Sequence, residues 1–205
     1  MAYPTVAAPY GFKPVNLVGG QVYTGSTRQY KIASGHATNI FFGEIVIMSS
    51  NGCVTSAALT ATTVNIVGVF QGCSYVNSLG QRVFSQYYPA TISQTPDTVN
   101  ETVAYVADDP NLVMKVAVVS GTTTIAQATR ANLVGGMVAL VVNAGSTITG
   151  DSAWAVLNAK DASTTTLPFR ILDVVPETSP ATGSFVEVMV TWNTGVHWMR
   201  RNAGV

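Results

Sequence analysis

The chain has 205 residues, of which ten are acidic and ten are basic, so its formal net charge is zero. Only 10% of the residues are charged, where about 25% is usual for a soluble domain. This length fits one domain with an appendage, or at most two small domains. The largest basic cluster is Arg200-Arg201, so we expect no nucleic-acid partner. A surface with so little charge favours a place within a larger assembly.

The sequence also disfavours a membrane partner and a secretory route. Its longest apolar run, residues 137–142 (MVALVV), is far shorter than the roughly 20 residues that span a bilayer. The first residues, MAYPTVAAPYG, lack the basic and apolar regions of a secretory signal. We therefore expect a protein made in a reducing cytoplasm, in which Cys53 and Cys73 are small buried side chains rather than a disulfide.

Residues 1–27 are predicted to form an extended N-terminal arm. Pro4, Pro9 and Pro14 prevent any helix longer than one turn between them. The apolar side chains between these prolines are too many for a solvated tail. Either the chain's own domain or another protein must therefore cover them.

Residues 28–205 are predicted to form a single all-β domain, a β-barrel or a β-sandwich with one short helix. Val, Thr, Ile and aromatic residues dominate, and the apolar runs are short and bounded by turn residues. The clearest unit is residues 44–57, where two β-prone runs flank Asn51-Gly52, a dipeptide that favours a hairpin turn. Residues 124–132 (TIAQATRAN) are predicted to be the helix. We expect further strands at residues 28–33, 64–70, 83–87, 103–106, 112–120, 138–142, 169–175 and 185–192.

Three stretches resemble parts of catalytic or phosphate-binding sites, and in each a simpler interpretation is stronger. Residues 20–27 (GQVYTGST) have the glycine spacing of a phosphate-binding loop, but Ser26 stands where the required lysine would be. Ser152 and His197 could be a nucleophile and its base, but no Asp lies in the right spacing before His197. Asp108-Asp109-Pro110 is typical of a turn between strands. We therefore predict that the protein is not an enzyme and binds no metal ion or cofactor.

The C-terminal sequence TWNTGVHWMRRN groups aromatic and arginine side chains, which the centres of protein interfaces prefer. Trp192 either ends a core strand or belongs to this surface. The residues that we predict to form a subunit interface here are Trp198, Met199, Arg200 and Arg201.

Several stretches between about Pro9 and about Trp192 carry a resemblance to a known family. They are IASGHATNIFFGEIV, NGCVTSA, IVGVFQGCSYV, FSQYYPA, AYVADDPNLVMKV and FRILDVV. Together they resemble virion proteins of tailed bacteriophages, notably marine and cyanobacterial ones, that are described as capsid decoration or cement proteins. A looser resemblance, to the small β-barrel of lambdoid head-decoration proteins, matches at Gly43, Asn51-Gly52 and Gly68-Val69.

The resemblance implies a structural virion protein on the outside of the capsid shell, assembled in the host cytoplasm, that cements neighbouring major capsid subunits. Lambdoid decoration proteins are trimers that bind the shell through an extended arm. We therefore expect a homotrimer, or alternatively a dimer, whose arm adds to a neighbour's sheet. The arm residues expected at this interface are Tyr3, Pro4, Val6, Tyr10, Phe12, Val15 and Leu17.

Two other functions compete with this expectation. One is a tail- or fibre-associated structural or glycan-binding module that uses exposed Trp and Tyr side chains. The other is a hydrolase that uses Ser152 and His197.

Overall fold

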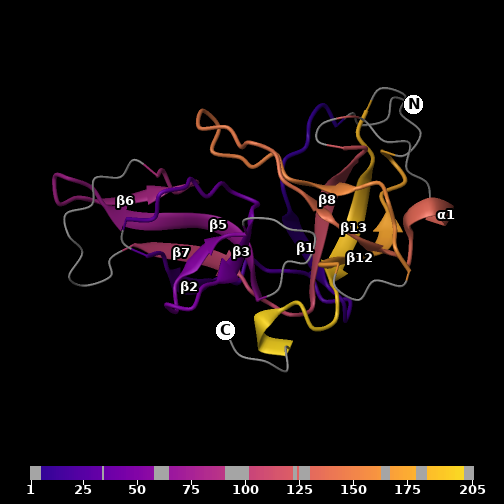
Figure 1. Ribbon diagram of the computed structural model, residues 1–205, viewed down its shortest axis with the longest axis horizontal. Coiled ribbons are helices and arrows are strands. Elements are labelled where there is room, and N and C mark those ends of the chain that lie inside the picture. The colour runs from indigo at the N-terminus through magenta and orange to yellow at the C-terminus, as the bar shows by residue number, and fades with distance from the viewer. Residues whose placement is uncertain are drawn as a thin grey trace.

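The computed structural model describes residues 6–33, 35–57, 65–90, 102–121, 124, 130–162, 167–178 and 184–200. Within these ranges the chain has thirteen strands, one short α-helix and one 3₁₀ turn, and neither helical segment has the length needed to cross a membrane. The strands form two sheets, one on each side of the molecule as drawn in Figure 1. The prediction of an all-β fold is confirmed.

The first sheet curls into a small, nearly closed barrel. Its strands are β2 (Arg28–Lys31), β3 (Ile45–Met48), β4 (Val54–Ser56), β5 (Ile66–Val76), β6 (Arg82–Ser85) and β7 (Val103–Ala107). Five of them are neighbours in the order β2-β7-β5-β3-β4, and β6 pairs with the second half of β5. A bridge between Ile32, just after β2, and Val54 in β4 joins the two ends of this order.

The second sheet also closes on itself. Its strands are β8 (Leu112–Val119), β9 (Met137–Val138), β10 (Leu140–Val141), β11 (Ala155–Leu157), β12 (Phe169–Val174) and β13 (Glu187–Trp192). The order is β10-β11-β8-β13-β12-β9. Since only Ala139 separates β9 from β10, the order begins and ends on one stretch of chain. Closing a sheet in this way leaves few free edges.

Strand β8 sets the inside and the outside of the second barrel. Leu112, Met114, Val116 and Val118 belong to its buried core, as expected for alternate residues of a strand. Lys115 lies on the opposite, outer face, between two core residues. Val113, Ala117 and Val119 lie on this outer face too and are buried, so the outer face of β8 needs a cover of its own.

The N-terminal segment contributes to that cover, because Val6 packs against a cluster that contains Ala117 and Val119 of β8. The segment also joins the sheet and the core. Strand β1 (Lys13–Leu17) pairs antiparallel with the first half of β8, on the edge that β11 uses along the second half. The Phe12 side chain is fully buried and stacks on Phe169, with ring centres 4.7 Å apart. Residues 6–17 are thus extended, as predicted, but they are part of the β domain. The assignment of Phe12 to a partner interface is wrong, because no part of its side chain is exposed.

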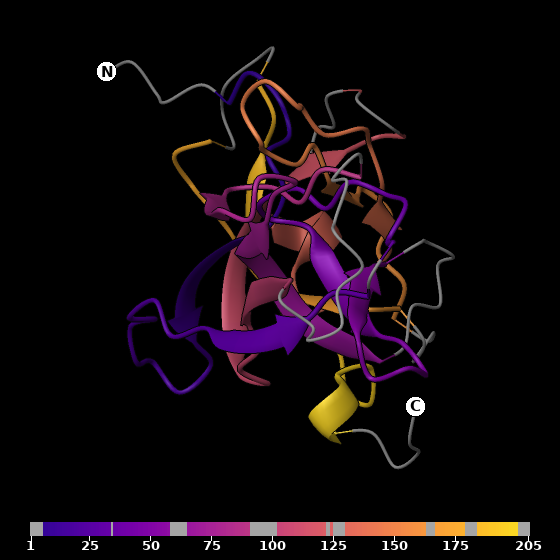
Figure 2. The same cartoon turned by 90° about the vertical axis from the view of Figure 1, so that its left-hand side faces the viewer.

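The two barrels pack side by side and share one cluster of buried side chains. Figure 1 shows them from the side, and Figure 2 looks along the molecule from the end of the first barrel. The first barrel contributes Ile45, Ile66, Val69 and Ala107 to this cluster, and the second contributes most of the rest. The first barrel also has a separate core of its own: Ile32, Ile40, Val46, Val54, Val67, Phe70, Cys73, Tyr88, Ala104 and Val106.

Most predicted elements have a counterpart in the structure. The hairpin of residues 44–57 is β3 and β4, with Gly52 at a positive φ of 76° in the turn. The helix α1 (Arg130–Leu133) overlaps only the end of the predicted helix, of which residues 125–129 lie outside the described residues. The strand predicted at residues 138–142 is the pair β9 and β10. Strands β1 and β11 were not predicted.

The burial of Phe12 leads to the first prediction. Phe12→Ala would remove a ring from the buried cluster that the two barrels share, so we expect it to lower the free energy of unfolding by about 3–5 kcal/mol. Urea denaturation followed by Trp fluorescence measures this change. Val22→Ala, at a side chain that is 71% exposed, is the matched control and should change stability by less than about 0.5 kcal/mol. Equal stability of the two variants would contradict the packing described here.

Candidate functional site

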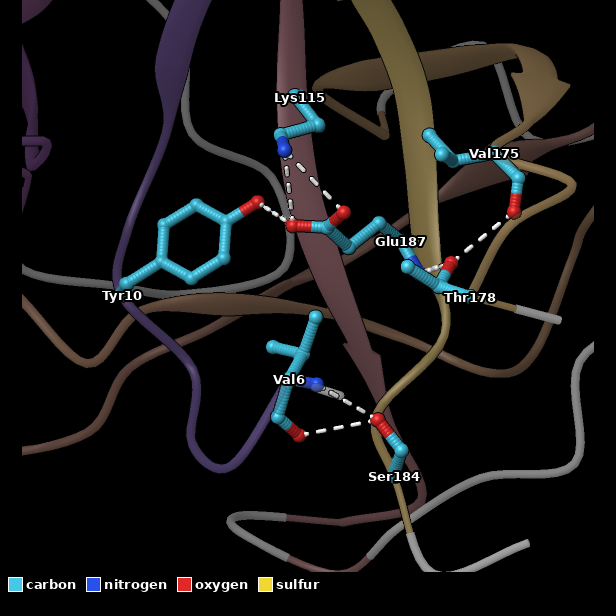
Figure 3. Close-up of polar contacts among 7 residues, drawn as sticks. All are labelled: Val6, Tyr10, Lys115, Val175, Thr178, Ser184 and Glu187. Atoms are coloured by element: carbon cyan, nitrogen blue, oxygen red, sulfur yellow. Dashed lines mark hydrogen bonds and ion pairs between the residues drawn. The ribbon is translucent and has the colours of Figure 1, made fainter. Parts of the chain in front are cut away.

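Glu187, a buried carboxylate on the outer face of the second barrel, is the centre of the polar contacts in Figure 3. The Tyr10 hydroxyl donates a hydrogen bond to one carboxylate oxygen, and the Lys115 ammonium lies 3.2 Å from each of the two. Burial, and then the hydrogen bond and charge of Glu187, raise the pKa of Tyr10 well above its ordinary value of 10.0. Tyr10 is therefore a neutral donor that holds the N-terminal segment to an ion pair.

Backbone and hydroxyl groups hold Glu187 and the N-terminal segment in place. The Thr178 hydroxyl accepts the backbone N–H of Glu187 at 2.9 Å and donates to the carbonyl of Val175 at 3.0 Å. The backbone N–H of Val6 donates to the Ser184 hydroxyl at 2.7 Å (Figure 3). We call this set of contacts, made by Val6 and Tyr10 with Lys115, Ser184 and Glu187, the N-terminal anchor.

The anchor shows where the predicted arm residues lie. Val6 and Tyr10 contact the chain's own second barrel, and Val15 and Leu17 are half-buried in β1. Tyr3 and Pro4 lie outside the described residues. Residues 6–17 of the predicted arm therefore cover the domain that carries them.

Sequence reasoning missed Lys115 and Glu187. Each is a single charged residue in an otherwise apolar strand, in LVMKVAVV and in EVMVTW. A lone charge on a largely buried strand needs a partner, and this is the signal that could have found the pair.

The anchor leads to the second prediction. Tyr10→Phe removes the hydroxyl that donates to the Glu187 carboxylate, so we expect the free energy of unfolding to fall by about 1.5–3 kcal/mol. Tyr23→Phe is the matched control, because the Tyr23 hydroxyl donates to a backbone carbonyl in an exposed loop. Urea denaturation of both variants measures the difference, and a loss in Tyr23→Phe as large as that in Tyr10→Phe would contradict it.

A groove of about 420 Å³ brings together three stretches that are far apart in the sequence. They are the loop of residues 18–27, the turn at Asp108-Asp109-Pro110 and the C-terminal 3₁₀ turn η1 (Trp198–Arg200). Val22 and Met199, which are 71% and 39% exposed, are the apolar side chains at its surface. We call this the loop groove.

Asp108 lies at the acidic end of the loop groove, where two side chains hold its carboxylate. The Arg28 guanidinium lies 3.1 Å from a carboxylate oxygen of Asp108, and the Tyr30 hydroxyl donates to the same oxygen at 2.6 Å. Burial, and then the hydrogen bond to Asp108, raise the pKa of Tyr30. Asp109 accepts the backbone N–H of Asn111 at 2.7 Å, which confirms the predicted turn.

The predicted C-terminal interface residues lie partly inside the protein. Trp198 packs against the core of the first barrel, with its ring edge-on to Tyr30 at 6.4 Å. Met199 is exposed at the loop groove, and Arg200 donates to the side chain of Asn111 at 2.7 Å. Arg201 lies outside the described residues. Of these four, Met199 and Arg200 are the two that the described structure leaves at the surface.

Ser152 and His197, the candidate nucleophile and base of the hydrolase alternative, make hydrogen bonds with different partners. The Ser152 hydroxyl accepts the backbone N–H of Trp154 at 3.1 Å. The His197 ring lies 5.8 Å from the Trp192 ring, and one ring nitrogen accepts the N–H of Met199 at 3.4 Å. In the described parts of the chain, no group of three or more His, Cys, Asp or Glu side chains could hold a metal ion.

Glu44 is a buried carboxyl group in the first barrel. The Ser56 hydroxyl donates a hydrogen bond to it at 2.8 Å. Burial raises the pKa of Glu44 from 4.5 to about 7, although this hydrogen bond partly opposes the effect. The charged form is thus disfavoured in the folded chain.

The third prediction follows from Glu44. Between about pH 4.5 and 7 the unfolded chain loses this proton before the folded chain does, so the free energy of unfolding should fall as the pH rises, by up to about 3 kcal/mol, and level off above pH 7. Glu44→Gln should remove this slope and make the protein more stable at pH 8. Denaturation at several pH values measures it, with the exposed Glu177→Gln as the control. An unchanged slope in Glu44→Gln would contradict the prediction.

Comparison of the chain with protein-family models, with curated proteins and with solved structures gives no match. The function proposed below therefore rests on the residues of this chain and on the resemblance noted in its sequence.

Proposed function

We propose that the protein is a structural component of a bacteriophage particle that binds the outside of the capsid shell and joins neighbouring major capsid subunits. The observation that carries the proposal is the loop groove, where apolar side chains stay exposed beside an ion pair on a protein with little surface charge. A surface of this kind is suited to permanent contact with a partner. The resemblance to phage decoration proteins is the reason for proposing the major capsid protein as that partner.

The loop groove, which includes residues 18–27 of the predicted arm, takes the partner-binding role that the sequence assigned to residues 3–17. Val18, Val22 and Met199 are exposed at or next to the groove, and a partner segment that covered them would remove apolar surface from water at roughly 25 cal/mol per Å². The Arg28–Asp108 ion pair and the Arg200 guanidinium border these side chains. Such charges at the rim of an interface favour orientation more than affinity.

Self-association is a second part of the proposal. Little charge and zero net charge give weak electrostatic protection against association. We propose a homotrimer, with a dimer as the alternative. Sedimentation velocity at micromolar concentration distinguishes these states from a monomer, which would contradict this part.

The fourth prediction tests capsid binding. Met199→Asp and Val22→Asp would each place a carboxylate in the loop groove, so we expect the affinity for capsids that lack this protein to fall at least tenfold, as for an interface hot spot. Co-sedimentation with such capsids measures it. Leu79→Asp, at a side chain that is 80% exposed on the β5–β6 turn, is the matched control and should bind as the natural chain does.

Two outcomes would count against the proposal. Undiminished binding by Met199→Asp and Val22→Asp would exclude the loop groove as the contact surface. No binding of the natural chain to such capsids, or labelling of tails instead of shells in electron micrographs, would exclude the capsid role.

A further inference from the structure

A second hollow, of about 500 Å³, lies on the outer face of the first barrel. It is lined by residues of β5, β6 and β7, which lie side by side in Figure 1, and by Phe42 and Gln86 outside these strands. None of its lining residues lines the loop groove. We call it the aromatic cleft; the residues that define it here are Phe42, Gln71, Gly72, Phe84, Gln86 and Tyr105.

Gly72 lies at the floor of the cleft, between two strands that each carry an aromatic ring. Phe84 and Tyr105 come from the strands on either side of β5, and Gly72 lies on β5 between them. Gly72 has a φ of +129°, and a Cβ there would lie 3.0 Å from the carbonyl oxygen of Ser85. The register of β5 and β7 also shifts between Phe70 and Cys73. A β-bulge of this kind is a common way to form a site on a sheet.

The polar side chains in the cleft are neutral and are held in place. The Gln86 amide donates to Asp151 at 2.8 Å, and the Gln71 amide donates to the carbonyl of Phe70 at 3.3 Å. The Tyr105 hydroxyl donates to Ser74 at 3.4 Å. Among the described residues that line the cleft, none carries a formal charge. A ligand that matches this lining is itself uncharged and has hydrogen-bonding groups.

The exposed ring of Phe84 indicates a second property of the ligand, a flat apolar surface. Its side chain is 71% exposed, and a large aromatic ring in water beside a cleft is available to stack on a flat apolar surface. A pyranose ring has such a surface on its C–H face and hydroxyl groups around its edge. It would place the C–H face on the aromatic ring and the hydroxyls toward the carboxamides. We propose that the aromatic cleft binds a neutral sugar residue of a glycan.

An extended peptide fits the position of the cleft less well. A peptide that added a strand to this sheet would pair with the outer edge of β6, whereas the cleft lies on the face of the sheet between β6 and β7. A phosphorylated or sulfated ligand would need cations, which the described lining does not provide. The inference does not depend on capsid binding, because the two surfaces use different residues.

The probes for this test are maltotriose, cellotriose and triacetylchitotriose, which are neutral and differ in linkage and substituents. Saturation-transfer NMR detects weak binding to the full-length protein, and calorimetry measures affinity for a probe that binds. We expect at least one probe to bind with its C–H protons closest to the protein. Phe84→Ala should weaken that binding about tenfold or more, and because Phe84 is exposed this change should leave the fold intact.

Leu79→Ala, on the turn that joins β5 to β6 and outside the cleft lining, is the matched control and should bind as the natural chain does. The proposal is overturned if none of the three sugars binds at 10 millimolar, or if Phe84→Ala binds as tightly as Leu79→Ala. It is also overturned if a sulfated heparin tetrasaccharide or an extended apolar peptide binds at the cleft in their place.

Discussion

The structure depends on the place where the N-terminal segment passes between the two barrels, at Gly11 and Phe12. The backbone N–H of Phe12 donates to Gly43 of the first barrel at 2.8 Å, and that of Gly11 donates to Trp154 of the second at 3.1 Å. A Cβ on Gly11 would lie 2.7 Å from the Gly43 carbonyl oxygen, so the backbones could not approach this closely with another residue. The Phe12 ring then fills the shared core. This crossing sets the relative position of the barrels together with the shared core and the hydrogen bonds that join Phe42 to Gly150 and Ser152.

The same crossing explains how a buried charge is tolerated on the outer face of the second barrel. Glu187 is almost completely buried, and a buried carboxylate is stable only if it is paired and hydrogen-bonded. Lys115 supplies the charge from the neighbouring strand, whereas Tyr10 supplies a hydrogen bond that exists only when the N-terminal segment is in place. Docking of this segment and the burial of Glu187 are therefore coupled, and the anchor favours one position of the segment over others.

The strands could be predicted from the sequence because short β-branched runs separated by turn residues are a local signal. The hairpin at Asn51-Gly52 is an example. Closure of the barrels could not be predicted from the sequence, because it depends on pairings between distant residues, such as Ile32 with Val54. Strand β1 was missed because residues 1–27 were assigned to an arm that adds to a neighbour's sheet, whereas β1 pairs with β8 of its own chain. As an edge strand it tolerates Pro14. The loop groove joins residues 18–27, 108–110 and 199, which no local pattern connects.

Barrel closure also constrains how such a chain can meet its partners. Sheet edges are the usual route to unspecific association, and a chain with zero net charge has little electrostatic protection against it. Here the first barrel is nearly closed through the Ile32–Val54 bridge, the second closes on residues 137–141, and Pro14 removes one N–H from the edge formed by β1. With few edges available, specific recognition must come from side chains on loops and outer faces. The loop groove and the aromatic cleft are both surfaces of that kind, and each leaves the pairing of the barrels unchanged.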